Sequence, residues 1–212
     1  MSRSKGSKGC YGKTVSIGRI ILNTGSREDT NSMTCIAALV HNGTIHMASD
    51  SEASDDSSCV TISTPKIAVN GDYIVGVSQS LRVLNILHNT SLPPVPSLSN
   101  LYSFMSVEFV QDIAETLENT PGTATREKME EGTEILVGTL GRLFLIGSDY
   151  SVHEATQPYM AIGNGSLAAL GSLFSTDDLS PKNRVIKAVK ASAEFSTGVR
   201  GPINHLKFEQ TY

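Results

Sequence analysis

The sequence predicts an α+β protein in which two antiparallel sheets stack face to face and helices cover their outer faces, a four-layer αββα sandwich. Three observations support this fold class. Strand-like and helix-like segments come in blocks, in the order strands, two helices, strands, two helices, strand. Turn signals such as Asn-Gly join neighbouring strands into hairpins, which are antiparallel. The 212 residues, 39% of them apolar, are enough to bury one layered core.

Two predicted hairpins form the first strand block. Asn42-Gly43 and Asn70-Gly71 supply their turns, because both dipeptides favour the tight turns of hairpins. Several of the strands are apolar on both faces, as expected in a sheet that is covered on both sides. The predicted strands span residues 34–40, 44–52, 59–69 and 71–80.

The remaining elements follow the same block pattern. Helical spacing of apolar residues and helix-start signals, such as Ser180 before Pro181, indicate the helices. Residues 121–132 are charged and predict an exposed loop. The predicted helices span residues 81–88, 104–119, 166–175 and 179–196. Further strands are expected in a two-strand unit over 134–155, at 159–162 and in the tail 199–209.

The chain is expected to contain one folded domain behind an extension. Residues 1–33 open with a Gly/Ser/Lys-rich stretch that cannot bury enough apolar surface to order itself, although residues 15–22 are able to form one short strand. We therefore expect a flexible N-terminal extension or propeptide over 1–33 and a domain over 34–212.

Composition excludes several classes of function. A net charge of −4 gives no basic surface for nucleic acid or an anionic membrane. No apolar run approaches the roughly 18 residues that predict a membrane span. Three cysteines without CxxC spacing and five scattered histidines predict neither a disulfide framework nor a metal site. We expect a cytoplasmic protein, in the host cytoplasm if it is phage-encoded, without a cofactor.

Three polar residues stand at strand ends with equal spacing. Asp50 lies 16 residues after Thr34, and Lys66 lies 16 residues after Asp50. The end of the second strand of a hairpin returns beside the start of the first, so Asp50 is expected near Thr34. Lys66 begins a further strand that can enter the same end of the sheet. These residues are the candidate catalytic group.

The chemistry of this group requires an activated hydroxyl. A Thr hydroxyl is a weak nucleophile that needs a nearby base, and an N-terminal Thr carries its own α-amine with a pKa of roughly 7.7–8.0. A lysine ammonium lowers the pKa of the hydroxyl and of the amine, and an aspartate orients that lysine. A backbone N–H near a Gly/Ser-rich turn would stabilise the oxyanion. The candidate oxyanion and substrate-binding residues are Gly76, Ser78, Gln79 and Ser80.

Taken together, these motifs resemble the proteasome β-type peptidases, in particular the HslV-like threonine peptidases of phage and bacteria. The resembling stretches are TCIAALVHNGTIHMASDSE, PKIAVNGDYIVGVSQS and YMAIGNGSLAALGSLF, in family order over roughly residues 33–210. The resemblance implies an N-terminal nucleophile (Ntn) hydrolase fold and a threonine-type endopeptidase. It implies Thr34 as the nucleophile, with Asp50 and Lys66 tuning it.

The resemblance also implies two supporting residues and a set of partners. Asn164 stands where the family commonly has a serine in the late glycine turn, and Glu194 is the nearest match by register to an acid on the last helix. The implied substrate is a peptide or an unfolded protein. The implied assembly is a homo-oligomeric ring, with an ATP-dependent unfoldase as a further partner.

Two alternatives follow from the same residues. Thr34 is internal in the full-length chain, so a catalytically silent structural or assembly subunit has the same sequence pattern. An amidohydrolase that uses Cys35 after cleavage one residue later is a further reading. The peptidase reading requires a chain that begins at Thr34, either through autoproteolysis or because Met33 is the true initiator and is removed.

Overall fold

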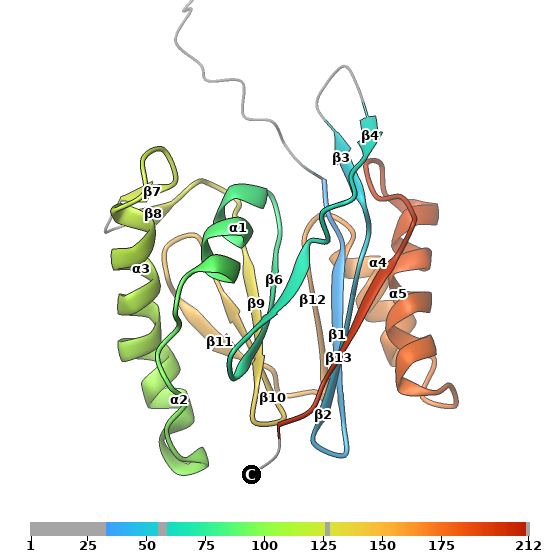
Figure 1. Cartoon of the computed structure of the whole chain (residues 1–212). Coiled ribbons are helices and arrows are strands. Elements are labelled where there is room, and N and C mark those ends of the chain that lie inside the picture. The colour runs from blue at the N-terminus through green and yellow to red at the C-terminus, as the bar shows by residue number, and fades with distance from the viewer. Residues whose placement is uncertain (1–32, 55–58, 126–127, 211–212) are drawn as a thin grey trace, which may run out of the picture.

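The structure is a computed structural model that describes residues 33–54, 59–125 and 128–210 (Figure 1). The expected extension, including the strand over 15–22, lies outside these residues except for Met33.

One sheet contains four antiparallel strands. The predicted first hairpin forms with its turn at Asn42 and Gly43, which both have positive φ. A strand from late in the chain pairs with β1, and the last strand pairs with β2. In spatial order the strands are β12 (Tyr159–Ile162), β1 (Ile36–His41), β2 (Thr44–Ser49) and β13 (Asn204–Phe208).

The second sheet contains five antiparallel strands. The predicted hairpin at Asn70-Gly71 is present, and the unit over 134–155 contributes three strands where two were expected. The third strand forms because the chain turns back after Gly147 and pairs again with β10. In spatial order the strands are β11 (Val152–Glu154), β10 (Arg142–Ile146), β9 (Ile135–Thr139), β6 (Tyr73–Val77) and β5 (Ile67–Asn70).

Two small hairpins project from the sandwich. The run predicted as one strand over 59–69 is divided, because β4 pairs with β3 while β5 joins the larger sheet. The loop predicted over 121–132 contains a short pair of strands. The four strands are β3 (Glu52–Ser54), β4 (Cys59–Thr61), β7 (Ala124–Thr125) and β8 (Lys128–Met129).

The helices form at the predicted places. Ser80 caps α1 by accepting a hydrogen bond from the Val83 N–H, and Pro181 begins α5 directly after Ser180. The second predicted helix is one continuous segment that includes a π-helical stretch over Met105–Phe109. The helices are α1 (Leu81–Asn89), α2 (Leu101–Phe104), α3 (Val110–Glu118), α4 (Ser166–Phe174) and α5 (Pro181–Phe195).

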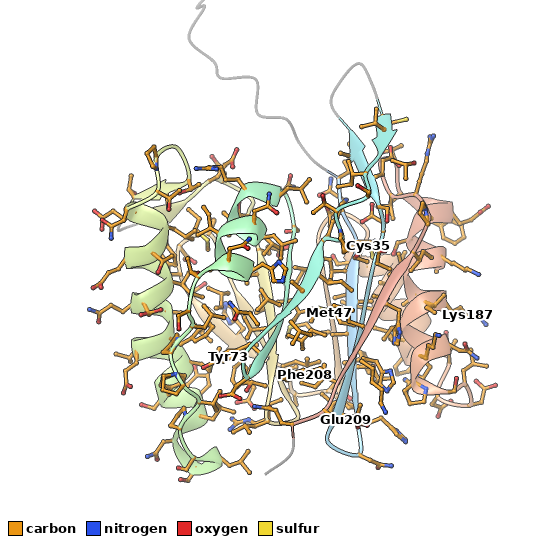
Figure 2. The ribbon with its side chains drawn as sticks, viewed as in Figure 1. Cys35, Met47, Tyr73, Lys187, Phe208 and Glu209 are labelled. Atoms are coloured by element: carbon orange, nitrogen blue, oxygen red, sulfur yellow. The ribbon has the colours of Figure 1, made fainter. Side chains whose placement is uncertain are left out.

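Three apolar cores hold the four layers together, which confirms the predicted αββα sandwich. Met47 lies in the core between the two sheets, and Tyr73 lies in the core between the five-stranded sheet and α1–α3 (Figure 2). A third core packs α4 and α5 on the four-stranded sheet and includes Cys35. Lys187 on α5 points away from it into solvent (Figure 2). Among the described residues, no helix is long and apolar enough to cross a membrane.

Candidate active site

Thr34, Asp50 and Lys66 meet in a buried cluster, close before β1, directly after β2 and directly before β5. The Lys66 ammonium donates to Thr34 Oγ1 at 3.0 Å and to both carboxylate oxygens of Asp50, at 3.1 and 2.9 Å. All three residues are at most 1% exposed. A nucleophilic oxygen, a cation and the anion that balances the cation are therefore held together away from water.

Both sheets contribute to this cluster. In the four-stranded sheet Ile36 lies opposite Ser49, so the next residue, Asp50, falls beside Cys35. Backbone and side chain of Asp50 both bind Cys35: its N–H donates to the Cys35 carbonyl at 3.2 Å, and its Oδ1 accepts the Cys35 N–H at 3.0 Å. Lys66 directly precedes β5 in the other sheet. Stacking of the two sheets therefore brings the ammonium to the hydroxyl.

Burial and charge act in opposite directions on Lys66. Burial lowers the pKa of its ammonium below the ordinary value, and the nearby Asp50 carboxylate limits this decrease. The Glu52 N–H also donates to the Asp50 carboxylate, at 3.0 Å. A lysine with a lowered pKa gives up a proton more easily than an exposed one. It is therefore suited to exchanging a proton with a neighbouring hydroxyl.

Lys66 also contacts the residue before Thr34. Its ammonium donates to the Met33 carbonyl oxygen at 3.2 Å. The Met33 side chain lies against Gly198, where an added Cβ would be 2.4 Å from the Met33 Cβ. The Met33–Thr34 peptide bond is thus held next to the Thr34 hydroxyl and the Lys66 ammonium.

The glycine turn after β12 supports the Thr34 backbone. Gly163 has φ +84°, and a Cβ at this position would be 2.3 Å from the Thr34 carbonyl oxygen. The Gly165 N–H donates to that same oxygen at 3.3 Å. Only glycine fits position 163, because any side chain would push the turn away from Thr34.

The segment with the predicted oxyanion donors follows β6 beside this turn. Gly76 lies within β6 and lets the sheets approach closely, since a Cβ there would be 2.9 Å from Ile36. The Ser78 N–H donates to the Glu134 carbonyl at 2.9 Å, and the Ser80 N–H to the Ser78 carbonyl at 2.7 Å. Gln79 has φ +65° in this tight turn. The N–H groups of Ser78 and Ser80 therefore have partners inside the protein.

The two supporting residues expected from the resemblance lie in different surroundings. Asn164 is exposed in the glycine turn, and its Oδ1 accepts from Gln79 Nε2 at 3.4 Å. Glu194 is exposed on α5, beside a surface pocket that Lys190 also lines. The structure thus brings Thr34, Asp50, Lys66 and the glycine turn together, with Glu194 on the solvent side of its helix.

Sequence reasoning missed Ser192, the α5 residue that faces the site region. Its hydroxyl accepts from Cys35 Sγ at 3.1 Å and donates to the Gly165 carbonyl at 2.7 Å. Burial raises the pKa of the Cys35 thiol to about 12. This thiol therefore packs in the core beside α4 and α5. Its burial disfavours the thiolate that nucleophilic chemistry would need.

Sequence reasoning also missed two glutamates near the site. Glu134 Oε2 accepts the Gly163 N–H at 2.8 Å. Glu52, whose side chain is 4% exposed, lies 3.5 Å from Arg200 Nε. The Arg200 carbonyl accepts the Ser51 N–H at 3.0 Å. The loop between α5 and β13, which contains Arg200, is therefore hydrogen-bonded to the end of β2 beside Asp50. A single charged residue beside a strand carries no sequence signal for either role.

Comparisons with known proteins identify the fold. No protein-family model matches the sequence, and no curated protein matches it. Among solved structures, BPH from Thiobacillus denitrificans superposes with a TM-score of 0.66 at 18% identity, covering 84% of this chain and 99% of that chain. Eukaryotic HslV from Trypanosoma brucei gives 0.62 at 14%, covering 84% and 100%. Anbu, an ancestral beta-subunit from Yersinia bercovieri, gives 0.58 at 17%, covering 82% and 81%.

These matches extend over most of each chain at low identity, so they establish the fold. The chain has the αββα architecture of proteasome-type Ntn hydrolases, as the sequence motifs predicted.

Proposed function

We propose that this protein is a threonine-type endopeptidase whose nucleophile is the hydroxyl of an N-terminal Thr34. The observation that carries the proposal is the contact of the Lys66 ammonium with Thr34 Oγ1 at 3.0 Å, while Asp50 holds the same ammonium through both carboxylate oxygens. Asn164 and the segment over 76–80 remain the proposed supporting and substrate-binding residues. Glu194 is exposed on α5, so Ser192 is the better candidate for support from that helix.

The Met33–Thr34 bond must be broken before the site is complete. In autoproteolysis, Thr34 Oγ1 attacks the Met33 carbonyl carbon, the C–N bond breaks and the hydroxyl proton passes to the Thr34 nitrogen. The resulting ester is hydrolysed by water, which leaves a carboxylate on Met33 and a free Thr34 amine. The Lys66 ammonium supports this step because it already donates to the Met33 carbonyl oxygen at 3.2 Å. Removal of Met33 as an initiator leads to the same amine.

Peptide hydrolysis then uses the free amine as the base. The amine takes the proton of Thr34 Oγ1 as this oxygen attacks the substrate carbonyl, and the proton passes to the leaving nitrogen. Lys66 stabilises negative charge on Oγ1, and Asp50 keeps Lys66 in place. Water hydrolyses the acyl-enzyme and restores the hydroxyl. The substrate class is a peptide or an unfolded protein.

The proposed assembly is a homo-oligomeric ring in the cytoplasm, with an ATP-dependent unfoldase as partner. The likeness to HslV and to an ancestral beta-subunit supports this proposal at the level of the fold. Nucleic acid and membrane are not proposed as partners, because the chain has a net charge of −4.

A catalytically silent subunit of the same fold is the second candidate. One observation favours it. The Ser80 N–H donates to the Ser78 carbonyl at 2.7 Å and is therefore already engaged inside the protein. In this alternative the buried pair of Lys66 and Asp50 joins the two sheets and has no chemical role.

Substitution of Thr34 distinguishes the two candidates. Thr34→Ala should abolish hydrolysis of fluorogenic peptides, and Thr34→Ser should retain part of it because serine keeps the hydroxyl. Thr61→Ala, on exposed β4, is the matched control and should leave the rate unchanged. Hydrolysis that persists in Thr34→Ala would overturn the proposal. A wild-type protein inactive on a broad peptide library, with its mass retaining residues 1–33, would favour the silent subunit.

A further inference from the structure

Glu134 links two segments, one of which packs on Thr34. It lies directly before β9, and its Oε2 accepts the Gly163 N–H at 2.8 Å. Its backbone N–H donates to Ser78 Oγ at 3.2 Å, and its carbonyl accepts the Ser78 N–H at 2.9 Å. One residue therefore connects the glycine turn after β12 to the segment that follows β6.

The glycine turn sets the position of Thr34. Gly163 packs so closely on the Thr34 carbonyl oxygen that an added Cβ would lie 2.3 Å from it, and the Gly165 N–H donates to this oxygen at 3.3 Å. A small shift of the turn would therefore move the Thr34 backbone. The Glu134 carboxylate opposes such a shift because it holds the Gly163 N–H through a charge-assisted hydrogen bond.

The hydrogen bonds between Glu134 and Ser78 fix the segment that was predicted to bind substrate. Ser78 precedes Gln79 and Ser80, where the chain makes its tight turn with φ +65° at Gln79 before α1 begins. The two hydrogen bonds between Ser78 and the Glu134 backbone fix where this turn starts. Glu134 thus links the 78–80 segment to the glycine turn that packs on the Thr34 backbone.

We propose that Glu134 is a positioning residue for the Thr34 nucleophile: its carboxylate fixes the Gly163–Gly165 turn against Thr34, and its backbone fixes the 78–80 segment relative to that turn. This role rests on the proposed peptidase function. Glu134 contacts neither the Thr34 hydroxyl nor Lys66 through any hydrogen bond described, so it acts through the turn. Loss of the carboxylate should therefore lower kcat while KM stays nearly constant, because the alignment of the nucleophile changes and the surface that binds the peptide does not.

Two variants of Glu134 separate its hydrogen bond from its packing. Glu134→Leu keeps the approximate size and removes the acceptor, whereas Glu134→Gln keeps an acceptor oxygen at the same reach. Misplacement of a nucleophile by about 1 Å costs up to roughly 100-fold in rate, so Glu134→Leu should lower kcat by at least about tenfold. Glu134→Gln should remain within about threefold of wild type. Glu131→Leu, at an exposed glutamate of the same loop, is the control and should match wild type.

Hydrogen–deuterium exchange gives a readout that does not depend on activity. In full-chain protein, peptides that cover residues 162–165 should exchange faster in Glu134→Leu than in wild type and Glu134→Gln. The thermal unfolding midpoint should show that each variant is folded. If Glu134→Leu does not fold, Glu134→Asp replaces it, because aspartate keeps the charge but withdraws the oxygen by one methylene group.

The outcomes separate the two claims. Slow hydrolysis and fast exchange in Glu134→Leu, both rescued in Glu134→Gln, support the positioning role. Active wild-type protein with unchanged kcat in Glu134→Leu overturns that role and leaves the peptidase function standing. Rescue of neither property by Glu134→Gln also overturns it, since the acceptor oxygen is then not what matters. Wild-type protein without Thr34-dependent hydrolysis overturns the peptidase function, and the positioning role falls with it.

Discussion

Each member of the buried cluster at Thr34 depends on the others. The Asp50 carboxylate accepts the N–H groups of Cys35 and Glu52 at 3.0 Å each, in addition to the Lys66 ammonium. A buried ion pair adds little stability compared with apolar residues of the same size, but removal of one partner leaves an uncompensated charge. A cluster that only filled space would not need such a pair, and this supports the proposed chemistry of Thr34.

The first prediction concerns this pair. Asp50→Asn removes the negative charge and turns an amide NH2 toward either donor group, so the protein should lose about 3–5 kcal/mol of unfolding free energy. The double variant Asp50→Asn/Lys66→Met should lose less, because no unpaired charge remains buried. Urea denaturation at neutral pH measures both. A loss below about 1 kcal/mol for Asp50→Asn would mean that the pair behaves like an exposed one and would contradict this account.

The second prediction concerns the cysteines. The Cys35 thiol is fully buried and its pKa is raised to about 12, so the reactive thiolate is scarce near neutral pH. Iodoacetamide should alkylate exposed Cys59 in the native protein and should reach Cys35 only after denaturation. Peptide mapping by mass spectrometry gives the two rates. Alkylation of native Cys35 as fast as Cys59 would support the amidohydrolase reading.

At the scale of elements, the ends of β1, β2 and β5 hold the three site residues, and the glycine turn after β12 fixes the position of Thr34. Gly163 has little freedom, because it combines φ +84° with backbone contact to Thr34. Gly43, in the turn between β1 and β2, has φ +77° but nothing within 4 Å of an added Cβ. Substitution of Gly43 therefore measures the cost of backbone strain alone, and substitution of Gly163 measures this cost together with that of a steric clash.

The third prediction compares these glycines. Gly43→Ala should cost about 1–2 kcal/mol, the strain of a left-handed backbone at a residue with a Cβ. Gly163→Ala adds a clash with the Thr34 carbonyl oxygen, so it should cost clearly more and abolish Thr34-dependent hydrolysis. Urea denaturation and peptide hydrolysis measure the two effects. Equal stability of the two variants would show that the contact between the turn and Thr34 is looser than described.

The fourth prediction concerns the contact between β2 and β13. His46 Nδ1 and His205 Nε2 are 3.2 Å apart, and burial lowers the pKa of both rings below 6.5. Below about pH 6.5 the two histidines therefore bind protons more readily in the unfolded chain than in the folded chain. Unfolding free energy should decrease as pH falls below about 6.5 toward the lowered pKa values. Charged groups that act on this pair are His41, Lys182, Lys207 and Glu209.

Substitution of both histidines tests this sign. His46→Gln/His205→Gln should flatten the fall in unfolding free energy between pH 7 and 5, whereas His153→Gln, at an exposed histidine of β11, should not. Urea midpoints across this pH range provide the measurement. An unchanged slope in the double variant would show that the pair does not link stability to pH.

For the whole molecule, local sequence signals predicted the helices and strands. They did not predict which strands distant in sequence pair with one another. Turn dipeptides and apolar periodicity act within a few residues, so both helix blocks and the hairpins at Asn42 and Asn70 were predictable. The pairing of β12 with β1 joins segments more than 100 residues apart, and no local signal marks it. The third strand of the unit over 134–155 is a local hairpin with β10, and it was missed because its turn after Gly147 carries no Asn-Gly signal.

The site divides in the same way. Thr34, Asp50 and Lys66 were predictable because each stands at a strand end with matched spacing. Ser192 was missed because two residues along a helix turn the side chain by about 200°, so the register that suggested Glu194 reached the opposite face. Glu134 was missed because its acceptor role depends on a backbone N–H that lies 29 residues away.

The N-terminal residue of the active protein decides whether Thr34 acts as the nucleophile. Intact-mass measurement, with N-terminal sequencing, should be made on the same wild-type preparation whose peptide hydrolysis is measured. We expect a chain that begins at Thr34, because only a free amine completes the group formed with Lys66 and Asp50. A preparation that hydrolyses peptides while its mass retains residues 1–33 would contradict it.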